Sequence, residues 1–267
     1  MDALGENVKI MARIHPTAIV EPGAKLADDV TIGAYAYVGP SVCLDSGCTL
    51  HHHGVVEGNS VLGKNNEIFP FAAIGGRTQD LKYDGTDGVL RIGDGNIFRE
   101  FVTVHCPTSA NGETRIGDGN YLLSYAHVAH ECLLHDDIII STQAVLGGHV
   151  EIDSHANIGG ASAIHQFCKV GKYALLGGGS ALVQDLPPYM LAEGNRARVR
   201  SYNKVGLQRH GFSEEEVAAV RRIHRHLYGA GLNRTQALER VSGDDSIPGP
   251  LKEELFQFRD RCSRGML

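Results

Sequence analysis

The chain has 267 residues and a formal net charge of −6, which suits one large domain or one domain with an appendage. No stretch approaches the roughly 20 apolar residues of a membrane-spanning helix. The N-terminus carries Asp2 and Glu6 and has no long apolar run, so it is not a signal peptide. We therefore expect a soluble cytoplasmic protein with no stable membrane insertion and no nucleic-acid partner.

A six-residue rhythm of aliphatic side chains runs from Ile14 to Leu182. Only Asp80, Thr86 and Ala110 interrupt it. Neither a helix nor a simple strand has period six, whereas a coil of very short parallel strands with a tight turn in each repeat does. A fixed period over this length indicates a solenoid, in which each coil buries its core only against its neighbours. Three hexads per coil predict a triangular prism.

A second register lies four residues after each aliphatic position and holds mostly small side chains. It contains Cys48, Cys132 and Cys168, which we expect to fill the core; they imply no disulfide framework. The 33 glycines suit a turn every six residues, and the absence of Trp suits an aliphatic core.

Two segments leave the rhythm without losing its frame. The first, near residues 75–91, replaces two hexads and should loop out of one coil. Long loops on rigid scaffolds often hold function, so its polar residues Gln79, Asp80 and Lys82 are candidates, with a plain surface loop equally open. The second lies near residues 105–115. The run His51–His53 is interpreted as a solvated or inter-subunit rung, because adjacent strand residues alternate faces and cannot all reach one metal ion.

Two histidines three residues apart, His127 and His130, lie inside the best-formed run of coils. Because one coil is about three hexads, His130 should fall nearly above Gly148 and His149, with Gln166 a further coil along. Several such side chains in register along one edge of the prism favour a site over surface decoration. Histidine suits a general base, and a glycine amide lets the backbone approach a developing oxyanion.

The prism should end at Asp185–Tyr189, since paired prolines cannot continue a ladder. From Arg196 the pattern turns helical. Ser213–Glu216 is a capping box that opens a helix through about Tyr228, and shorter helices are expected near residues 235–241 and 251–259. We therefore predict a β-helix over residues 1–194 and an α-helical domain over 195–267. Basic side chains dominate between residues 194 and 225, which favours an anion site over a plain solvated face.

Seven segments together resemble the UDP-N-acetylglucosamine O-acyltransferases, a family of hexapeptide-repeat enzymes. The likeness covers nearly the whole chain from His15. These segments are His15–Val20, Gln79–Tyr83, Ala126–His130, Gly148–Val150, His165–Cys168, Gln184–Tyr189 and Gly194–Asn195.

The resemblance implies a left-handed prism and a homotrimer with active sites in clefts between neighbouring prisms. It implies transfer of a 3-hydroxyacyl chain from acyl carrier protein to the 3-hydroxyl of UDP-N-acetylglucosamine, the first step of lipid A synthesis, with no cofactor or metal. By position, His130 matches the general base and Gly148 the oxyanion amide, while Gly178 matches a position that limits acyl length. The positions that match substrate contacts are Asp80, Lys82, His127, His149, His165, Gln166, Asn203 and Arg209.

Three residues depart from the family pattern: Glu131 where Asp usually follows the base, His210 where a second basic residue follows Arg209, and Val205 where an acidic residue is common. Other functions stay open at this point. The chain could be another hexapeptide acyltransferase, N-acyl or acetyl-CoA-dependent, or a zinc hydratase on the same prism with histidines from adjacent subunits.

Overall fold

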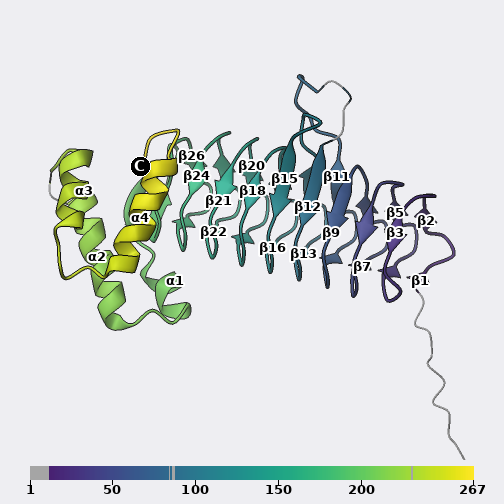
Figure 1. Cartoon of the computed structure of the whole chain (residues 1–267), viewed down its shortest axis with the longest axis horizontal. Coiled ribbons are helices and arrows are strands. Elements are labelled where there is room, and N and C mark those ends of the chain that lie inside the picture. Colours follow the sequence, from purple (N-terminus) through teal and green to yellow (C-terminus); the bar gives the residue numbers. More distant parts are fainter. Residues whose placement is uncertain (1–11, 84, 86–87, 230) are drawn as a thin grey trace, which may run out of the picture.

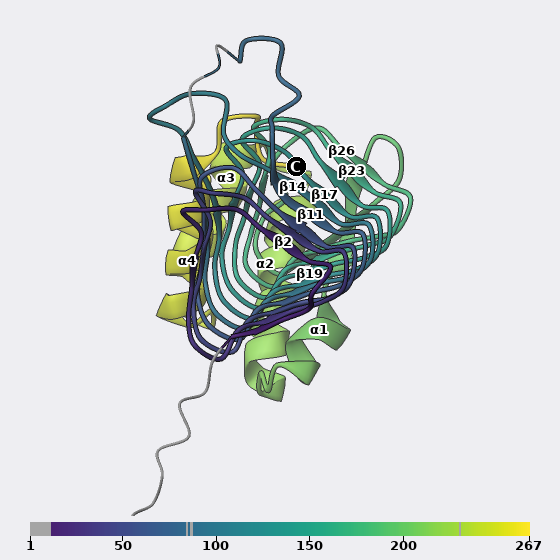
Figure 2. The same ribbon diagram turned by 90° about the vertical axis from the view of Figure 1, so that its right-hand side faces the viewer.

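The computed structural model describes residues 12–83, 85, 88–229 and 231–267. Short strands stack into a long prism, and helices gather at its C-terminal end (Figure 1). The strands form three sheets, which we name A, B and C. Seen from the N-terminal end, the chain turns counterclockwise as it recedes, so the prism is left-handed (Figure 2).

Nearly all strands pair in parallel with the strand one coil away. Sheet A contains β1 (Arg13–Ile14), β4 (Thr31–Ile32), β7 (Thr49–Leu50), β10 (Glu67–Ile68), β13 (Ile97–Phe98), β16 (Tyr121–Leu122), β19 (Ile139–Ile140), β22 (Asn157–Ile158), β25 (Leu175–Leu176), β27 (Met190–Glu193) and β28 (Arg198–Tyr202). Sheet B contains β2 (Ile19–Val20), β5 (Tyr37–Val38), β8 (Val55–Val56), β11 (Ala73–Gly76), β14 (Thr103–His105), β17 (His127–Val128), β20 (Val145–Leu146), β23 (Ala163–Ile164) and β26 (Ala181–Leu182). Sheet C contains β3 (Lys25–Leu26), β6 (Cys43–Leu44), β9 (Ser60–Leu62), β12 (Val89–Ile92), β15 (Glu113–Ile116), β18 (Leu133–Leu134), β21 (Glu151–Ile152) and β24 (Lys169–Val170).

The six-residue rhythm is the inward register of this prism. In most two-residue strands from β4 onward the second side chain is buried and the first faces out, as at Thr31 and Ile32 of β4. The small register is buried as well, including Cys48, Cys132 and Cys168. One excursion leaves between β11 and β12 and another between β14 and β15, yet β12 still pairs in parallel with β15, and β14 with β17. The expected fold class is therefore confirmed.

Each coil turns through three corners, named here by the sheets they join: A/B, B/C and C/A. At most corners the second turn residue has a left-handed backbone, as at Tyr125, Glu131 and Asp137, with φ of 63°, 51° and 55°. Such angles are unusual for non-glycine residues. Because the same position recurs one coil later, residues at one corner form a column along the prism.

The prism extends beyond its paired prolines, contrary to the sequence-based expectation. Pro188 occupies the first turn position of a C/A corner, where no ladder N–H is needed, and β27 then adds to sheet A in parallel with β25. The segment after Arg196 is also not helical at first, because β28 pairs antiparallel with β27. The division at residue 194 stays a prediction.

The helices are α1 (Lys204–Arg209), α2 (Glu214–Tyr228), α3 (Arg234–Ser242) and α4 (Gly249–Arg261). The capping box at Ser213 is present and opens α2 as predicted. The helix α4 lies along the outside of sheet C (Figure 2), where Arg261 binds Asp153 at 2.8 Å and also Glu151. Of the described helices, none is long and apolar enough to cross a membrane.

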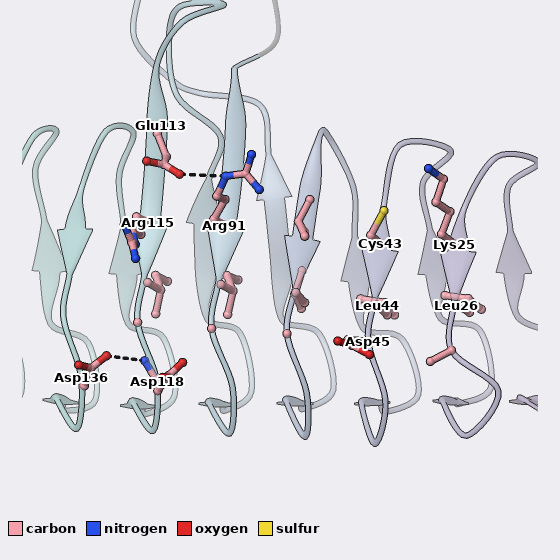
Figure 3. Close-up of a pocket in the computed structure, with 18 residues that line it drawn as sticks. Lys25, Leu26, Cys43, Leu44, Asp45, Arg91, Glu113, Arg115, Asp118 and Asp136 are labelled. Atoms are coloured by element: carbon pink, nitrogen blue, oxygen red, sulfur yellow. Dashed lines mark hydrogen bonds and ion pairs between the residues drawn. The ribbon is translucent and has the colours of Figure 1, made fainter.

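Sheet C also bears an open hollow of about 810 Å³, nearer the N-terminal end (Figure 3). Its rim includes an ion pair between Arg91 and Glu113 at 3.1 Å. At the C/A corner beside it, the carboxylate of Asp136 accepts a hydrogen bond from the Asp118 N–H at 2.8 Å (Figure 3). None of the candidate site residues lines this hollow.

Candidate active site

The candidate site is built on the B/C corner, where β17 turns into β18. The His149 N–H donates to the His130 carbonyl at 3.0 Å, and the Phe167 N–H donates to the Gly148 carbonyl at 3.0 Å. These two bonds hold His130, Gly148 and Gln166 on successive coils of one column. The stacking predicted from the three-hexad coil is therefore confirmed for these residues.

The imidazole of His130 is fixed from two sides. Its Nδ1 makes a short hydrogen bond with a carboxylate oxygen of Glu131, so an ionised Glu131 requires the proton on Nδ1 and leaves Nε2 as the acceptor. Against the other side lies Gly148, where an added Cβ would stand 2.6 Å from Nε2. Glycine at this position is what allows the ring to pack against the next coil.

Glu131 is itself held in place by two threonines. Its second carboxylate oxygen accepts the Thr108 N–H at 2.8 Å, and its own N–H donates to Oγ1 of Thr114 at 2.9 Å. The longer side chain at this position therefore still reaches the base. A nucleophile or base oriented by a third group is the recurring arrangement of acid–base sites.

The first excursion brings Asp80 to His130. Oδ2 of Asp80 lies 3.9 Å from Nε2 of His130. The Asp80 N–H donates to Thr78 at 3.1 Å, and the Lys82 N–H donates to Oδ1 of Asp80 at 2.9 Å. Gln79 and Lys82 are exposed. Asp80 therefore sits over the site, with Lys82 and Gln79 beside it on the same loop.

Further histidines surround the base on the sheet B side. The ring of His127 lies 4.8 Å from that of His105 and its Nδ1 is 2.7 Å from Oγ1 of Thr103. Burial, with smaller contributions from His105 and His130, lowers the pKa of His127 to about 4. His127 is therefore neutral at physiological pH, which suits a hydrogen-bonding role rather than a charged one.

His149 lies next along the column. Its ring meets that of His130 edge-on at 5.3 Å and stacks on Phe167 at 4.5 Å. Burial lowers the pKa of His149 as well. Sequence reasoning did not find Thr103, His105 or Thr108, because the two excursions break the regular spacing that would have aligned them with the column.

The main-chain N–H of Gly148 makes no hydrogen bond to any described residue. The N–H of the first turn residue takes no part in the ladder. At the C/A corner such groups are satisfied by carboxylates one coil on, as Asp94 N–H is by Asp118 at 2.7 Å. Within the described part of the chain, no acceptor faces the Gly148 N–H. A free donor beside a positioned base is the arrangement that stabilises an oxyanion.

Three candidate residues lie away from the B/C corner of the same chain. Asn203 donates to the Tyr173 carbonyl at the C/A corner at 2.9 Å and caps α1, which ends at the exposed Arg209. Gly178 lies at the A/B corner. A single prism therefore does not bring these residues to His130.

A basic pocket of about 840 Å³ opens beside His165, between the end of sheet B and the helices. Its cationic lining consists of Arg196, Arg198, Arg234 and Arg264. This agrees with the basic segment after residue 194.

Three possible metal ligands converge at the site: His130, Glu131 and His149. Nδ1 of His130 is already bonded to Glu131. This pairing favours the two residues as a base and its orienting carboxylate.

Comparisons with known proteins agree with this geometry. A family model described as UDP-N-acetylglucosamine O-acyltransferase, domain 2, matches residues 185–267. A relative from Burkholderia orbicola, named acyl-(acyl-carrier-protein)–UDP-N-acetylglucosamine O-acyltransferase, is 43% identical over 264 residues, which is 96% of this chain and 100% of that protein. One of the same name from Herminiimonas arsenicoxydans is 40% identical over 261 residues, 96% of this chain and 100% of that protein.

Two solved structures are similar throughout. LpxA from Acinetobacter baumannii has a TM-score of 0.91 at 38% identity, covering 95% of this chain and 99% of that one. LpxA from Bacteroides fragilis, a UDP-N-acetylglucosamine acyltransferase, has a TM-score of 0.91 at 34% identity, with the same coverage. The left-handed prism of hexads, together with these relatives, places the chain among the hexapeptide-repeat acyltransferases. Within that class, the chain belongs to the UDP-N-acetylglucosamine O-acyltransferase family.

Proposed function

We propose that this protein transfers a 3-hydroxyacyl group from acyl carrier protein to the 3-hydroxyl of UDP-N-acetylglucosamine, the opening step of lipid A synthesis in the cytoplasm. The observation that carries the proposal is the base, carboxylate and free amide at one corner: His130, Glu131 and Gly148. No cofactor is needed, because acyl transfer from a thioester to an alcohol requires only a base and a stabilised oxyanion.

The reaction proceeds by direct attack. Nε2 of His130 takes the proton of the sugar hydroxyl as its oxygen attacks the thioester carbonyl. Glu131 stabilises the imidazolium that forms, and the Gly148 N–H donates to the oxyanion. When the intermediate collapses, the carbonyl re-forms, the carbon–sulfur bond breaks, and the proton passes from His130 to the departing thiolate. The free cysteines at the core positions are buried and do not compete as nucleophiles.

Three copies assemble through sheet B. Its outward side chains carry no lysine, arginine or carboxylate in the described strands, whereas those of sheets A and C do. The outward positions of sheet B are Ile19, Tyr37, Val55, Ala73, Thr103, His127, Val145, Ala163 and Ala181. Uncharged, partly apolar faces of this kind mark interfaces. A homotrimer with three sheets B turned to a common axis covers them all.

This symmetry completes the site. Around a threefold axis, the B/C corner of one copy meets the A/B corner of the next, and rotation leaves the level along the axis unchanged. His130 then shares a cleft with the column that leads to Gly178 of the partner subunit, three coils or ~14 Å further on. The apolar acyl chain lies in this cleft. The arginines after residue 194 hold anionic groups of the two substrates.

The deciding experiment is mass spectrometry of the product formed from UDP-N-acetylglucosamine and a panel of acyl carrier protein thioesters. A single O-acylated nucleotide sugar is expected. The matched control is His130→Ala, which should form product roughly 10² to 10⁴ times more slowly, the usual share of a general base. N-acylated product, or acylation from acetyl-CoA alone, would assign the chain to another acyltransferase of this class.

A further inference from the structure

An exposed ladder of aromatic rings runs along the A/B corner. This corner borders sheet B on one side, and the B/C corner with His130 borders it on the other. The ladder consists of Tyr35, His53, Phe71, Phe101 and Tyr125, with successive ring centroids 5.2, 5.0, 5.1 and 4.7 Å apart; the first pair is tilted and the others are stacked. The exposed fractions of Phe71, Phe101 and Tyr125 are 48%, 41% and 53%. All five have left-handed backbone angles, which bulky side chains seldom adopt. A ridge of this kind is an interaction surface.

The ladder stops at the catalytic coil. Tyr125 belongs to the coil that carries His130, and the next residues of the same column are Gln143, Ala161 and Gly179. One corner is therefore filled with rings up to the level of the base and carries smaller side chains beyond it. The change of composition at this level ties the ladder to the site rather than to general packing.

A complementary side chain lies on the first excursion. Leu81 is fully exposed, at 101%, between Asp80 and Lys82. The excursion leaves the coil of Phe71, but Asp80 reaches His130 two coils further on, so the loop runs along the prism toward the catalytic coil. Leu81 is thus presented at the level of the last ladder rings, and the described part of the chain leaves its side chain uncovered.

We propose that Leu81 of each copy packs on Phe101 and Tyr125 of the partner subunit, and that this contact holds the excursion over the active site. The inference rests on the proposed trimer, in which the B/C corner of one copy faces the A/B corner of the next at equal height. Burial of Leu81 fixes the loop, and the loop sets the positions of Asp80 and Lys82 relative to His130. Leu81 is a positioning residue, because it acts through its neighbours on the loop.

Cysteine cross-linking tests the contact without reference to catalysis. Chains carrying Leu81→Cys and Phe101→Cys should form an inter-subunit disulfide under mild oxidation, seen as dimers and trimers on a non-reducing gel. A disulfide requires Cα atoms within roughly 7 Å. The matched control, Leu81→Cys with Tyr35→Cys, places the second thiol three ladder steps or ~14 Å away and should not cross-link. Each single variant controls for the native cysteines.

Absence of the 81–101 disulfide, whether the protein is trimeric or monomeric, overturns the inference, and so does equal cross-linking of the control pair. Loss of acyl transfer alone leaves the cross-linking result intact, so failure of the proposed function is distinguished from failure of the contact.

Kinetics provide the second measurement. Leu81→Ser should leave the trimer intact and raise the KM for the nucleotide sugar by about tenfold, because the loop is no longer held by apolar burial. Leu81→Met keeps an apolar side chain at this position and should keep the wild-type KM. The control Ile139→Ser removes another exposed aliphatic side chain, 40% exposed on sheet A, and should behave as wild type. An unchanged KM in Leu81→Ser would show that the loop is held by other contacts.

Discussion

Replacing Gly148 with alanine tests the geometry of the base directly. The new Cβ would stand 2.4 Å from Cε1 and 2.6 Å from Nε2 of His130, whereas ordinary contact begins at 3.4 Å, so the ring must retreat by about 1.0 Å. It cannot do so freely, because Glu131 holds Nδ1 on its other side. The substitution therefore moves the base away from the acceptor hydroxyl without removing any polar group from the site.

A displacement approaching 1 Å at a reacting group costs about a hundredfold in rate. We expect kcat of Gly148→Ala to fall by about that factor with little change in KM, as for an interaction used in the transition state. Gly148 lies outside the left-handed region, so alanine fits the backbone and the melting temperature should hold. Steady-state transfer from an acyl carrier protein thioester measures kcat and KM, and calorimetry measures the melting temperature.

The control is Gly249→Ala. Gly249 is the first residue of α4, lies outside the left-handed region, and an added Cβ there would meet nothing in the described chain within 4 Å. Turnover within twofold of wild type in a folded Gly148→Ala variant would refute the reasoning, as would an equal loss in Gly249→Ala.

Three further outcomes are expected. Arg209→Ala should raise the KM for the nucleotide sugar more than it lowers kcat, since a ground-state contact is lost; steady-state kinetics with varied acceptor would decide. Gly178→Met should shift preference to shorter acyl donors in a competition assay, because an added Cβ would meet only the Gly160 backbone, with its carbonyl oxygen nearest at 3.2 Å, and the side chain would extend into the cleft. Burial lowers the pKa of His127 to about 4, so its stabilising contribution is complete above pH 6.5 and is lost as pH falls from 6.5 to 4. The melting temperature of His127→Gln should therefore fall less steeply over that range than that of wild type.

The prism was predictable from the sequence because its core is periodic. Every inward residue from Ile32 to Leu182 repeats the same contacts one coil on, so the period alone fixes burial, pairing and the column that joins His130 to Gly148. Non-periodic contacts were not predictable. The bond from Thr108 to Glu131 spans an excursion of irregular length, and no repeat places it.

The chain after Gly194 shows which features outside the repeats could be predicted from the sequence and which could not. The antiparallel strand β28 depends on pairing with β27, and propensity does not reveal it, whereas the capped helix α2 is a local feature and was found. The sequence also did not reveal that Asn203 and Arg209 lie away from His130 in the same chain. A family resemblance assigns a role to each position, but it does not say whether two positions meet within one copy or between neighbouring copies.

The contrast between two corners leads to a final prediction. At the C/A corner, consecutive first-turn N–H groups donate to the carboxylate of the first-turn residue one coil on, from Asp94 to Asp118 at 2.7 Å and from Asp118 to Asp136 at 2.8 Å. The residue equivalent to that acceptor for Gly148 is Gln166. Gln166→Asp should therefore cap the Gly148 N–H and remove it from the oxyanion, lowering kcat about tenfold or more below Gln166→Ala, which loses the same side chain without adding an acceptor. Equal kcat values for the two variants would show that the Gly148 amide is not the donor the oxyanion uses.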